Sequence, residues 1–245
     1  MKKNEWPSVS IITPTLNSAR TIDEYFNAIK KQKYKGKVEI LILDGGSNDN
    51  TLDVAKKNRA RIFHNSLKTA EAGKALGVRK AIGDIYAFID SDNVLSDILW
   101  LEKLVNPIVE DREILASEPI RFTYRKDDHW LTRYFALIGA GDPTNLFIGN
   151  YDKYSYITNK WTDLELYQEN KKGYIKVKLE DKLPTIGANG FLIKKDALNN
   201  YKFGDYLFDV DLLESLIKRD PIFVSKVEVG IVHLFSGDIS TFIRK

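Results

Sequence analysis

Cysteine is absent from the 245 residues of the chain. This absence excludes disulfide bonds, thiolate zinc sites and cysteine nucleophiles. Long apolar runs are also absent, since none approaches the roughly 18 residues that a membrane-spanning helix needs. The first ten residues, MKKNEWPSVS, carry positive charge but lack the apolar stretch of a secretory signal. We therefore expect a cytoplasmic protein, and the basic end Ile243-Arg244-Lys245 leaves open contact with the inner face of a membrane.

An excess of charge of one sign is lacking too. Lys and Arg number 37 and Asp and Glu number 34, which gives a net charge of +3. This balance gives no electrostatic reason to expect a nucleic-acid partner. The patterns GxGxxG and GxxxxGK[ST] do not occur, so neither a dinucleotide-binding fold nor a P-loop is supported.

Regular alternation of strands and helices is present in the first 120 residues. The expected strands cover residues 8–13, 38–43, 61–64 and 85–89, and the expected helices cover residues 21–33, 51–58, 70–81 and 96–110. Thr21 and Glu24 have the spacing of a capping box, and Ser96 is a suitable N-cap for the fourth helix. The strands are almost continuously apolar, which is typical of a parallel sheet covered on both faces. The sequence therefore predicts an α/β fold.

Beyond about residue 120 this alternation is lost. Residues 121–173 are rich in Tyr, Trp and Phe without a clear period. They form either ordinary packing or a surface that grips a sugar ring or a lipid. A strand at 190–193, a helix at about 209–218 and a strand at 223–229 follow. No repeat or linker divides the chain, so we expect one compact domain.

Polar residues follow three of the predicted strands directly. The segments are Thr13–Asn17, Asp44–Asp49 and Asp90–Asn93. Because ligands bind beyond the carboxyl ends of parallel strands, we expect these segments to share one rim. In the second segment, Asp44-Gly-Gly-Ser could let a ligand approach the backbone closely, or could be a plain strand-to-helix turn.

Paired carboxylates occur at Asp90-Ser-Asp92 and at Asp209-Val-Asp211. On an extended segment the first pair can face one Mg²⁺ or Mn²⁺ ion that also binds substrate phosphates. The alternative is a solvated acidic loop. The second pair begins a helix, where acids complement the helix dipole without any further role. His233 follows a strand and, taken alone, is most simply a structural histidine.

Taken in order, these segments resemble the family 2 glycosyltransferases of the GT-A fold. SVSIITPTLNSARTI is similar to the family's first strand and turn, and ILILDGGSNDNT is similar to its nucleotide loop. Gly73–Gly77 with Ala81–Asp84 lies where the family has A-R-N-x-G and A-x-G-D, and YAFIDSDN matches its D-x-D segment. The resemblance covers residues 8–95 closely. It implies a single-domain, Rossmann-like GT-A fold over residues 1–245, with a mostly parallel sheet flanked by helices.

The resemblance also implies roles for individual residues. Pro14, Thr15 and Asp44 would hold the base and ribose of a nucleotide, with Lys74 beside them and Asp90 facing the ribose. Further donor contacts on the same loops would be Asn17, Gly45 and Ser91. Asp92 would bind the metal ion, and His233 would be an extra metal ligand or phosphate contact.

Asp209 falls at the position of the family's general base. Phe208 stands where the family often has Glu, so Asp211 remains an alternative base. Ala75 replaces the Asn of A-R-N. The middle segment matches nothing general in the family, so the resemblance does not identify the acceptor.

The expected function is transfer of a sugar from a UDP- or GDP-sugar to a hydroxyl of a glycan or lipid-linked acceptor, with Mn²⁺ or Mg²⁺. Residues 1–120 would bind the donor, and residues 121–245 would bind the acceptor and supply the catalytic base. With one base and in-line attack, the anomeric configuration would invert. The alternatives are a nucleotidyltransferase that makes nucleotide sugars and a non-catalytic domain that binds nucleotide or carbohydrate.

Overall fold

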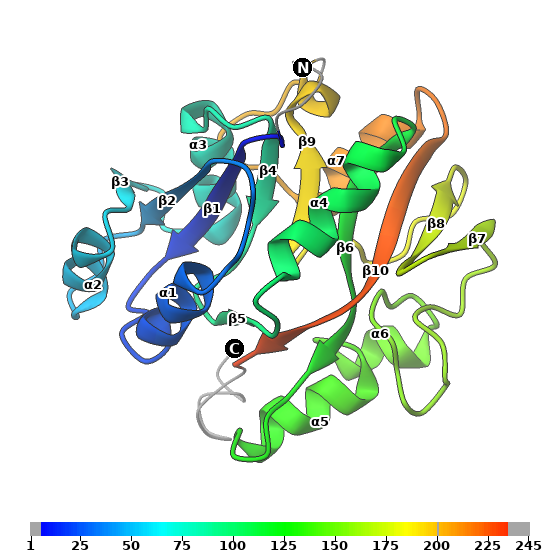
Figure 1. The fold of residues 1–245 in the computed structure, drawn as a ribbon, viewed down its shortest axis with the longest axis horizontal. Helices are drawn as coiled ribbons and strands as arrows, with labels where there is room; N and C mark the ends of the chain where they lie inside the picture. The colour runs from blue at the N-terminus through cyan, green and yellow to red at the C-terminus, as the bar shows by residue number, and fades with distance from the viewer. Residues whose placement is uncertain (1–5, 200, 235–245) are drawn as a thin grey trace.

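The computed structural model describes residues 6–199 and 201–234, whose strands form one mixed sheet with helices on both faces (Figure 1). The strands are β1 (Val9–Thr15), β2 (Val38–Asp44), β3 (Arg61–His64), β4 (Ile85–Phe88), β5 (Asn93–Leu95), β6 (Ile114–Thr123), β7 (Gln168–Lys171), β8 (Tyr174–Leu179), β9 (Phe191–Lys194) and β10 (Ile222–His233). The helices are α1 (Ile22–Lys30), α2 (Thr51–Lys57), α3 (Ala70–Lys80), α4 (Trp100–Glu110), α5 (Trp130–Ile138), α6 (Pro143–Phe147), the 3₁₀ helix η1 (Lys195–Leu198) and α7 (Asp209–Ile217).

The strand order is β3-β2-β1-β4-β9-β6-β10-β8-β7, and β5 pairs with the end of β10. Strands β3, β2, β1 and β4 are parallel neighbours. Strand β9 is antiparallel to both β4 and β6, so β6 and its parallel partner β10 run in the same direction as β1–β4. The α/β architecture with a mostly parallel sheet is therefore confirmed, and strands from both halves of the chain share this sheet.

Two apolar cores lie on opposite faces of the sheet. Helices α1, α2 and α4 pack on one face, where Ile11 and Trp100 are completely buried. Helices α3 and α7 pack on the other, where Ile12 and Leu212 are completely buried. Because successive strand side chains point to opposite faces, the run Ile11-Ile12 contributes to both cores. This explains why the parallel strands read as continuously apolar.

The start of two helices differs from the sequence prediction. Thr21 makes no side-chain cap for α1, and its hydroxyl lies 3.4 Å from the Ser18 carbonyl, so the capping box is wrong. Glu24 instead pairs with Arg125 at 2.8 Å. Helix α4 begins at Trp100 rather than at Ser96, because residues 93–95 form strand β5. Ser96 donates to the Gly230 carbonyl at 2.7 Å and holds β5 against β10.

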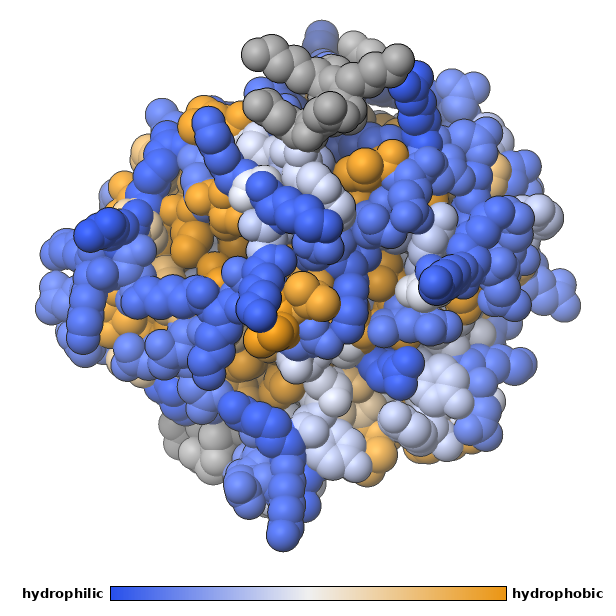
Figure 2. All heavy atoms as spheres, in the orientation of Figure 1, coloured by the Kyte–Doolittle hydropathy of each residue, from blue (hydrophilic) through white to orange (hydrophobic). Residues whose placement is uncertain are grey.

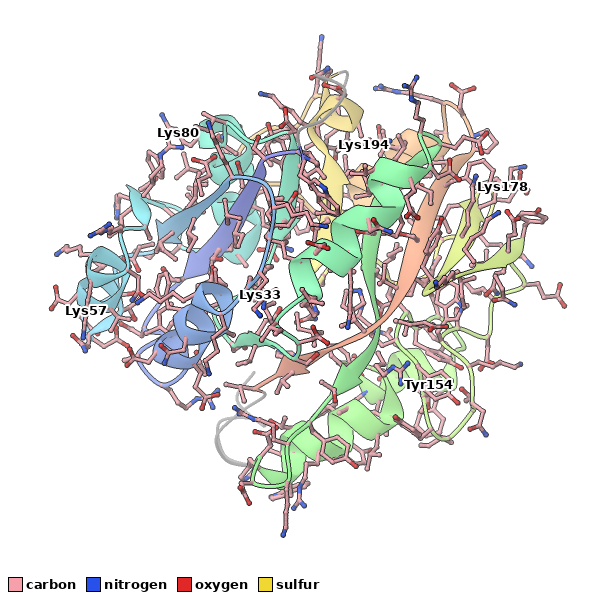
Figure 3. The ribbon with its side chains drawn as sticks, viewed as in Figure 1. Lys33, Lys57, Lys80, Tyr154, Lys178 and Lys194 are labelled. Carbon is pink, nitrogen blue, oxygen red and sulfur yellow. The ribbon has the colours of Figure 1, made fainter. Side chains whose placement is uncertain are left out.

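The segment without a clear period contains regular structure that the sequence analysis missed. It holds the helices α5 and α6 and strand β7, while β6 runs into it from residue 114 and β8 follows it directly. Helix α5 lies beyond the end of β6 in Figure 1. Tyr154, labelled in Figure 3, is anchored beside it by a hydrogen bond from its amide to the Ile120 carbonyl at 2.7 Å.

No helix in the described part of the chain has the length and apolar character needed to cross a membrane. The face seen in Figure 2 is mostly hydrophilic, with apolar areas scattered among charged side chains.

Candidate active site

The loops that follow β1 and β2 are joined by hydrogen bonds at the rim of the sheet. Thr15 donates to Asp44 Oδ1 at 3.0 Å, and the Gly45 amide donates to the Thr15 carbonyl at 2.8 Å. Asn17 adopts a left-handed φ of 52°. Its amide donates to Ser47 Oγ at 2.8 Å, and its side-chain Oδ1 accepts from the Asn48 amide at 3.0 Å. The sequence thus brings Thr15, Asn17, Asp44 and Gly45 together in one rigid double loop.

Asp44 organises this double loop. Its carboxylate accepts four hydrogen bonds, from the Thr15 hydroxyl, the Ser47 hydroxyl and the amides of Gly46 and Ser47, at 2.5–3.0 Å. Although burial acts in the opposite direction, these bonds hold the pKa of Asp44 below its usual value. The carboxylate is therefore ionised and fixed. Gly45 is covered by Lys68, whose Cα would lie 3.2 Å from an added Cβ, whereas Gly46 is open and has a φ of 95°.

Helix α3 approaches the first loop closely because Gly73 packs against Pro14. A Cβ on Gly73 would lie 2.9 Å from Pro14 Cβ, so only glycine allows this approach. The next residue, Lys74, is buried in the same place, with a side chain only 8% exposed. Lys74 forms an ion pair with Asp209 of α7. The pair joins the predicted nucleotide contact to the predicted base across 135 residues of sequence.

Burial dominates the electrostatics of Asp209. The side chain is 13% exposed, and its burial raises the pKa of the carboxyl to about 6, against the opposing effect of Lys74. Its Oδ1 atom is buried and has no hydrogen-bond partner in the described residues. For Lys74, the carboxylates of Asp209 and Asp90 outweigh burial and raise the pKa of the amine. Asp209 is thus a carboxylate poised to take up a proton near neutral pH, with one oxygen atom uncommitted.

The segment after β4 forms a tight turn. The Asn93 amide donates to the Asp90 carbonyl at 2.9 Å, and the Asn93 side chain accepts from the Asp90 amide at 3.3 Å. Ser91 contacts Ser18 through their hydroxyls at 2.8 Å, which ties this turn to the loop after β1. The three polar segments therefore meet at one rim, as predicted.

Asp92 and His233 lie side by side because of the pairing of β5 with β10. In that antiparallel register His233 is opposite Asn93. His233 Nε2 is 3.4 Å from Asp92 Oδ2, and the Leu234 amide donates to the Asp92 carbonyl at 2.8 Å. Both side chains are partly exposed, at 20% for His233 and 26% for Asp92. The two residues predicted as metal ligands are thus neighbours and reachable.

This pair suits a cation that brings other ligands with it. One carboxylate and one imidazole fit Mn²⁺ or Mg²⁺ whose remaining positions are filled by phosphate oxygens and water. Within residues 6–199 and 201–234, no group of three His, Asp or Glu side chains could form a cage made by the protein alone. Asp92 and His233 therefore fit a metal ion that is bound together with a substrate phosphate.

Asp90 interacts electrostatically with the Lys74–Asp209 ion pair and with the neighbouring Asp92 and His233. Burial raises the pKa of Asp90, Lys74 and His233 act to lower it, and Asp92 acts to raise it. Lys74 is the cation with the largest effect on Asp90, whereas Asp92 lies 3.4 Å from His233. The arrangement is an electrostatic network that crosses the rim from Asp92 and His233 to Asp209.

A cleft of about 450 Å³ adjoins Asp209. Its walls come from β6, α6, the segment before β9 and the start of α7: Phe122, Ala140, Gly141, Asp142, Asn145, Tyr151, Asp152, Thr185, Ile186, Ala188, Asn189, Phe208, Asp209, Val210 and Asp211. Gly187, with a φ of 119°, permits this geometry because an added Cβ would lie 2.4 Å from Asp209 Cβ. Asp211 lies on the exposed turn of α7 and lines the same cleft, so the structure offers both candidate bases to it.

Sequence reasoning missed several residues that shape this site. The buried Asn93 side chain donates to Asp92 Oδ1 at 3.3 Å and to Asn189 Oδ1 at 3.0 Å, which connects Asp92 to the wall of the cleft. Beneath the cleft, the fully buried Lys226 and Lys153 both pair with Glu118. Asn93 adjoins the D-x-D segment and could have been included with it. The Glu118 cluster has no signal in the sequence, because its members are far apart.

The aromatic segment supplies both core and surface. Tyr151 is fully buried, whereas Trp130, Tyr134, Phe147 and Tyr156 are between 45% and 88% exposed. Packing therefore accounts for part of the aromatic content. A role of the exposed part at a membrane or against a lipid stays a prediction.

A family model described as "Glycosyl transferase family 2" matches residues 10–202. The chain belongs to glycosyl transferase family 2. The match includes the loops after β1, β2 and β4, helix α3 and strand β9. It ends before Asp209 and His233, so their roles depend on the geometry described above.

Curated relatives of this glycosyltransferase family member match about half of the chain. Glycosyltransferase AglE of Haloferax volcanii is 31% identical over 135 residues, which cover 52% of this chain and 44% of AglE. Glycosyltransferase GlyG of Streptococcus pneumoniae is 29% identical over 138 residues, which cover 54% and 44%. The chain thus matches less than half the length of these relatives.

Solved structures share the fold over more of the chain. The mannosyltransferase PcManGT of Pyrobaculum calidifontis, in complex with GDP-Man and Mn²⁺, has a TM-score of 0.63 at 14% identity, covering 99% of this chain and 61% of PcManGT. Glucosyl-3-phosphoglycerate synthase of Mycobacterium tuberculosis, in complex with phosphoglyceric acid, has a TM-score of 0.52 at 19% identity, covering 87% and 66%. At these identities the likeness shows the GT-A fold alone.

Proposed function

We propose that this chain is a metal-dependent glycosyltransferase that moves a hexose from a UDP- or GDP-sugar to a hydroxyl acceptor. The observation that carries the proposal is the meeting, at one rim, of the Lys74–Asp209 ion pair with the neighbouring side chains of Asp92 and His233. Asp90 interacts electrostatically with both groups. Family membership and the complexes of the fold neighbours with GDP-Man, or with UDP and Mn²⁺, support the same function.

In this proposal the donor nucleotide lies on the double loop after β1 and β2. Pro14, Thr15, Asn17, Gly45 and Ser91 would border it, with the ribose near Asp90. Asp44 would act through its fixed negative charge and the shape of its loop, because its four acceptor positions are already used.

Asp92 and His233 would hold the cation. When bound, it supplies the positive charge that offsets the charge developing on the leaving diphosphate. Asn93 would orient the Asp92 carboxylate through its contact at 3.3 Å.

Asp209 would be the general base. It lines the cleft, one of its oxygen atoms has no partner in the described residues, and burial raises its pKa to about 6. A base with a pKa near the working pH accepts a hydroxyl proton efficiently. Lys74 would keep Asp209 ionised and oriented before the acceptor arrives. Asp211 remains a second candidate, since it lines the same cleft.

Attack by an acceptor hydroxyl from the cleft, opposite the diphosphate, inverts the anomeric configuration. With Asp209 as the general base, a single displacement is the simplest route. Proton NMR of the first-formed glycosidic bond tests this step. Retention of configuration would contradict it.

A thermal-shift panel tests which nucleotide sugar binds and whether its binding needs the metal. UDP-, GDP-, CDP- and dTDP-sugars are each added with and without Mn²⁺. A ligand that binds only the folded state raises apparent stability by about 2.7 kcal/mol at a concentration one hundred times its Kd. We expect one nucleotide class to stabilise the protein, and only with the metal. A non-catalytic binding domain would show the same shift without any release of nucleoside diphosphate when an acceptor is added.

A further inference from the structure

The cleft beside Asp209 has an unusual charge composition for a substrate site. Four carboxylates line it, from Asp142, Asp152, Asp209 and Asp211. Among the described residues that form its walls, none is Lys or Arg. An anionic group in this cleft would meet like charge without a compensating cation.

Three lysines that contact residues of the cleft wall are committed to ion pairs. Lys153 pairs with Asp152 and Glu118, and its side chain is 1% exposed. Lys226 pairs with Glu118 and is completely buried. Lys74 pairs with Asp209. These contacts neutralise Asp152 and Asp209. Within residues 6–199 and 201–234, Asp142 and Asp211 form no ion pair, so these two acids set the charge of the cleft.

The remaining walls suit a polyhydroxylated ring. Asn145, Thr185 and Asn189 offer neutral hydrogen-bonding groups, and the uncommitted Oδ1 atom of Asp209 is an acceptor for a hydroxyl proton. At the edge of the cleft, Phe208 is 49% exposed and its ring is stacked on Tyr206 at 6.3 Å. An exposed aromatic face of this kind can pack against the apolar face of a sugar ring.

We propose that the acceptor bound in this cleft is a neutral sugar hydroxyl rather than a phosphorylated or carboxylated group. The inference rests on the proposed function, because it assigns the substrate class of the same site. The physical reason is that placing like charges together in a partly desolvated site disfavours the anionic substrate. Neutral sugars lose no such energy and satisfy the acceptors of the wall.

The test compares neutral and anionic acceptors with the donor found in the thermal-shift panel. The neutral probes are methyl glucopyranoside and methyl mannopyranoside, and the anionic probes are glucose 6-phosphate and glucuronate. We expect kcat/KM for the anionic probes to be about tenfold or more below kcat/KM for the neutral probes, because like-charge contacts disfavour their binding. Raising NaCl from about 0.1 M to about 1 M, which shortens the Debye length from about 10 Å to about 3 Å, should narrow this difference.

Asp142→Asn is the informative variant. Asp142 caps α6 by accepting from the Thr144 amide at 2.8 Å, and Asn is an equally good N-cap, so the fold is retained. We define the selectivity ratio as kcat/KM for the anionic probes divided by kcat/KM for the neutral probes. Removal of the Asp142 charge should raise this ratio by about threefold to tenfold. Asp205→Asn, an exposed acid that precedes α7 and lies outside the cleft walls, is the matched control and should leave the ratio unchanged.

Three outcomes would overturn the inference. The enzyme could prefer the anionic probes, its rate with those probes could fall as salt is added, or Asp142→Asn could leave the ratio of anionic-probe to neutral-probe kcat/KM unchanged. If no probe is turned over, binding of the same probes is measured by calorimetry on protein saturated with nucleoside diphosphate and Mg²⁺. Binding of the phosphorylated sugar, or no binding of the neutral ones, also overturns it. Failure of the proposed function is distinguishable, because no nucleotide sugar would then bind with the metal.

Discussion

The proposed base is a single carboxylate, Asp209, which is held by a single amine, Lys74. Both are largely buried, and each alters the ionisation of the other. A buried acid whose pKa is raised is protonated in a higher pH range than a surface acid. Its neighbours therefore decide at which pH it can act as a base.

We expect transfer to fall as the pH decreases through about 6. The folded-state pKa of Asp209 is raised to about 6 by burial. The base is active only when ionised, so activity is present above that pKa and lost below it. A pH profile of kcat/KM checks this. An acid limb of the profile near the ordinary carboxyl value would contradict the assignment of Asp209 as the base.

Lys74→Met should move that acid limb to higher pH. Lys74 opposes the effect of burial on Asp209, so its removal favours the protonated carboxyl further. Lys74→Arg keeps the charge and is the control, with a limb close to wild type. Donor affinity is measured in parallel, since Lys74 is also a predicted nucleotide contact. If the acid limb of the pH profile lay at the same pH in Lys74→Met as in the wild type, the pairing of Lys74 with Asp209 would be contradicted.

At the scale of secondary-structure elements, the site depends on how closely α7 approaches the segment before β9. Gly187 allows this approach, because it has a φ of 119° and touches Asp209 Cβ. This conformation and this space are both available only to glycine.

Gly187→Ala should therefore displace the start of α7. We expect a loss of about 2–4 kcal/mol, from backbone strain together with overpacking. In a chain of this size, each kcal/mol lowers Tm by about 2–4 °C. Gly204→Ala is the control, because nothing lies within 4 Å of its added Cβ. Equal Tm values for the two variants would show that α7 does not depend on Gly187.

The floor of the cleft is held by a buried ionic cluster that joins β6, β10 and the loop after α6. Glu118 accepts from Lys226 and pairs with Lys153 at 3.3 Å, all three side chains being at most 1% exposed. Removing one partner of such a cluster leaves an uncompensated buried charge.

Glu118→Gln should cost about 3–5 kcal/mol of unfolding free energy, because two buried ammonium groups lose their shared carboxylate. Lys218→Ala breaks the exposed pair with Glu214 and is the matched control, with an expected cost of less than about 1 kcal/mol. Urea denaturation measures both. A small effect of Glu118→Gln would indicate that the cluster is hydrated.

At the scale of the whole molecule, the sequence predicted what short-range patterns determine. Strands β1–β4 and the rim that they form were predicted, because each is an apolar run followed by polar residues. Strand β6 was missed because Glu118, Pro119 and Arg121 interrupt its apolar pattern. The Ser96 cap was wrong because pairing with β10, more than 130 residues later, makes residues 93–95 a strand. The Lys74–Asp209 contact depends on the same long-range assembly, and its position in the site became visible only in the folded chain.

Calorimetric titration of the donor nucleotide with and without Mn²⁺, coupled to a turnover assay, tests most directly whether Asp92 binds the metal and Asp209 is the base. Asp92→Ala should abolish metal-dependent binding, because Asp92 and His233 form the proposed cation site. Asp209→Asn should bind donor as the wild type does and lose transfer by about 100-fold or more, the usual effect of removing a general base. Metal-dependent affinity that persists in Asp92→Ala, together with near-normal transfer in Asp209→Asn, would contradict the account.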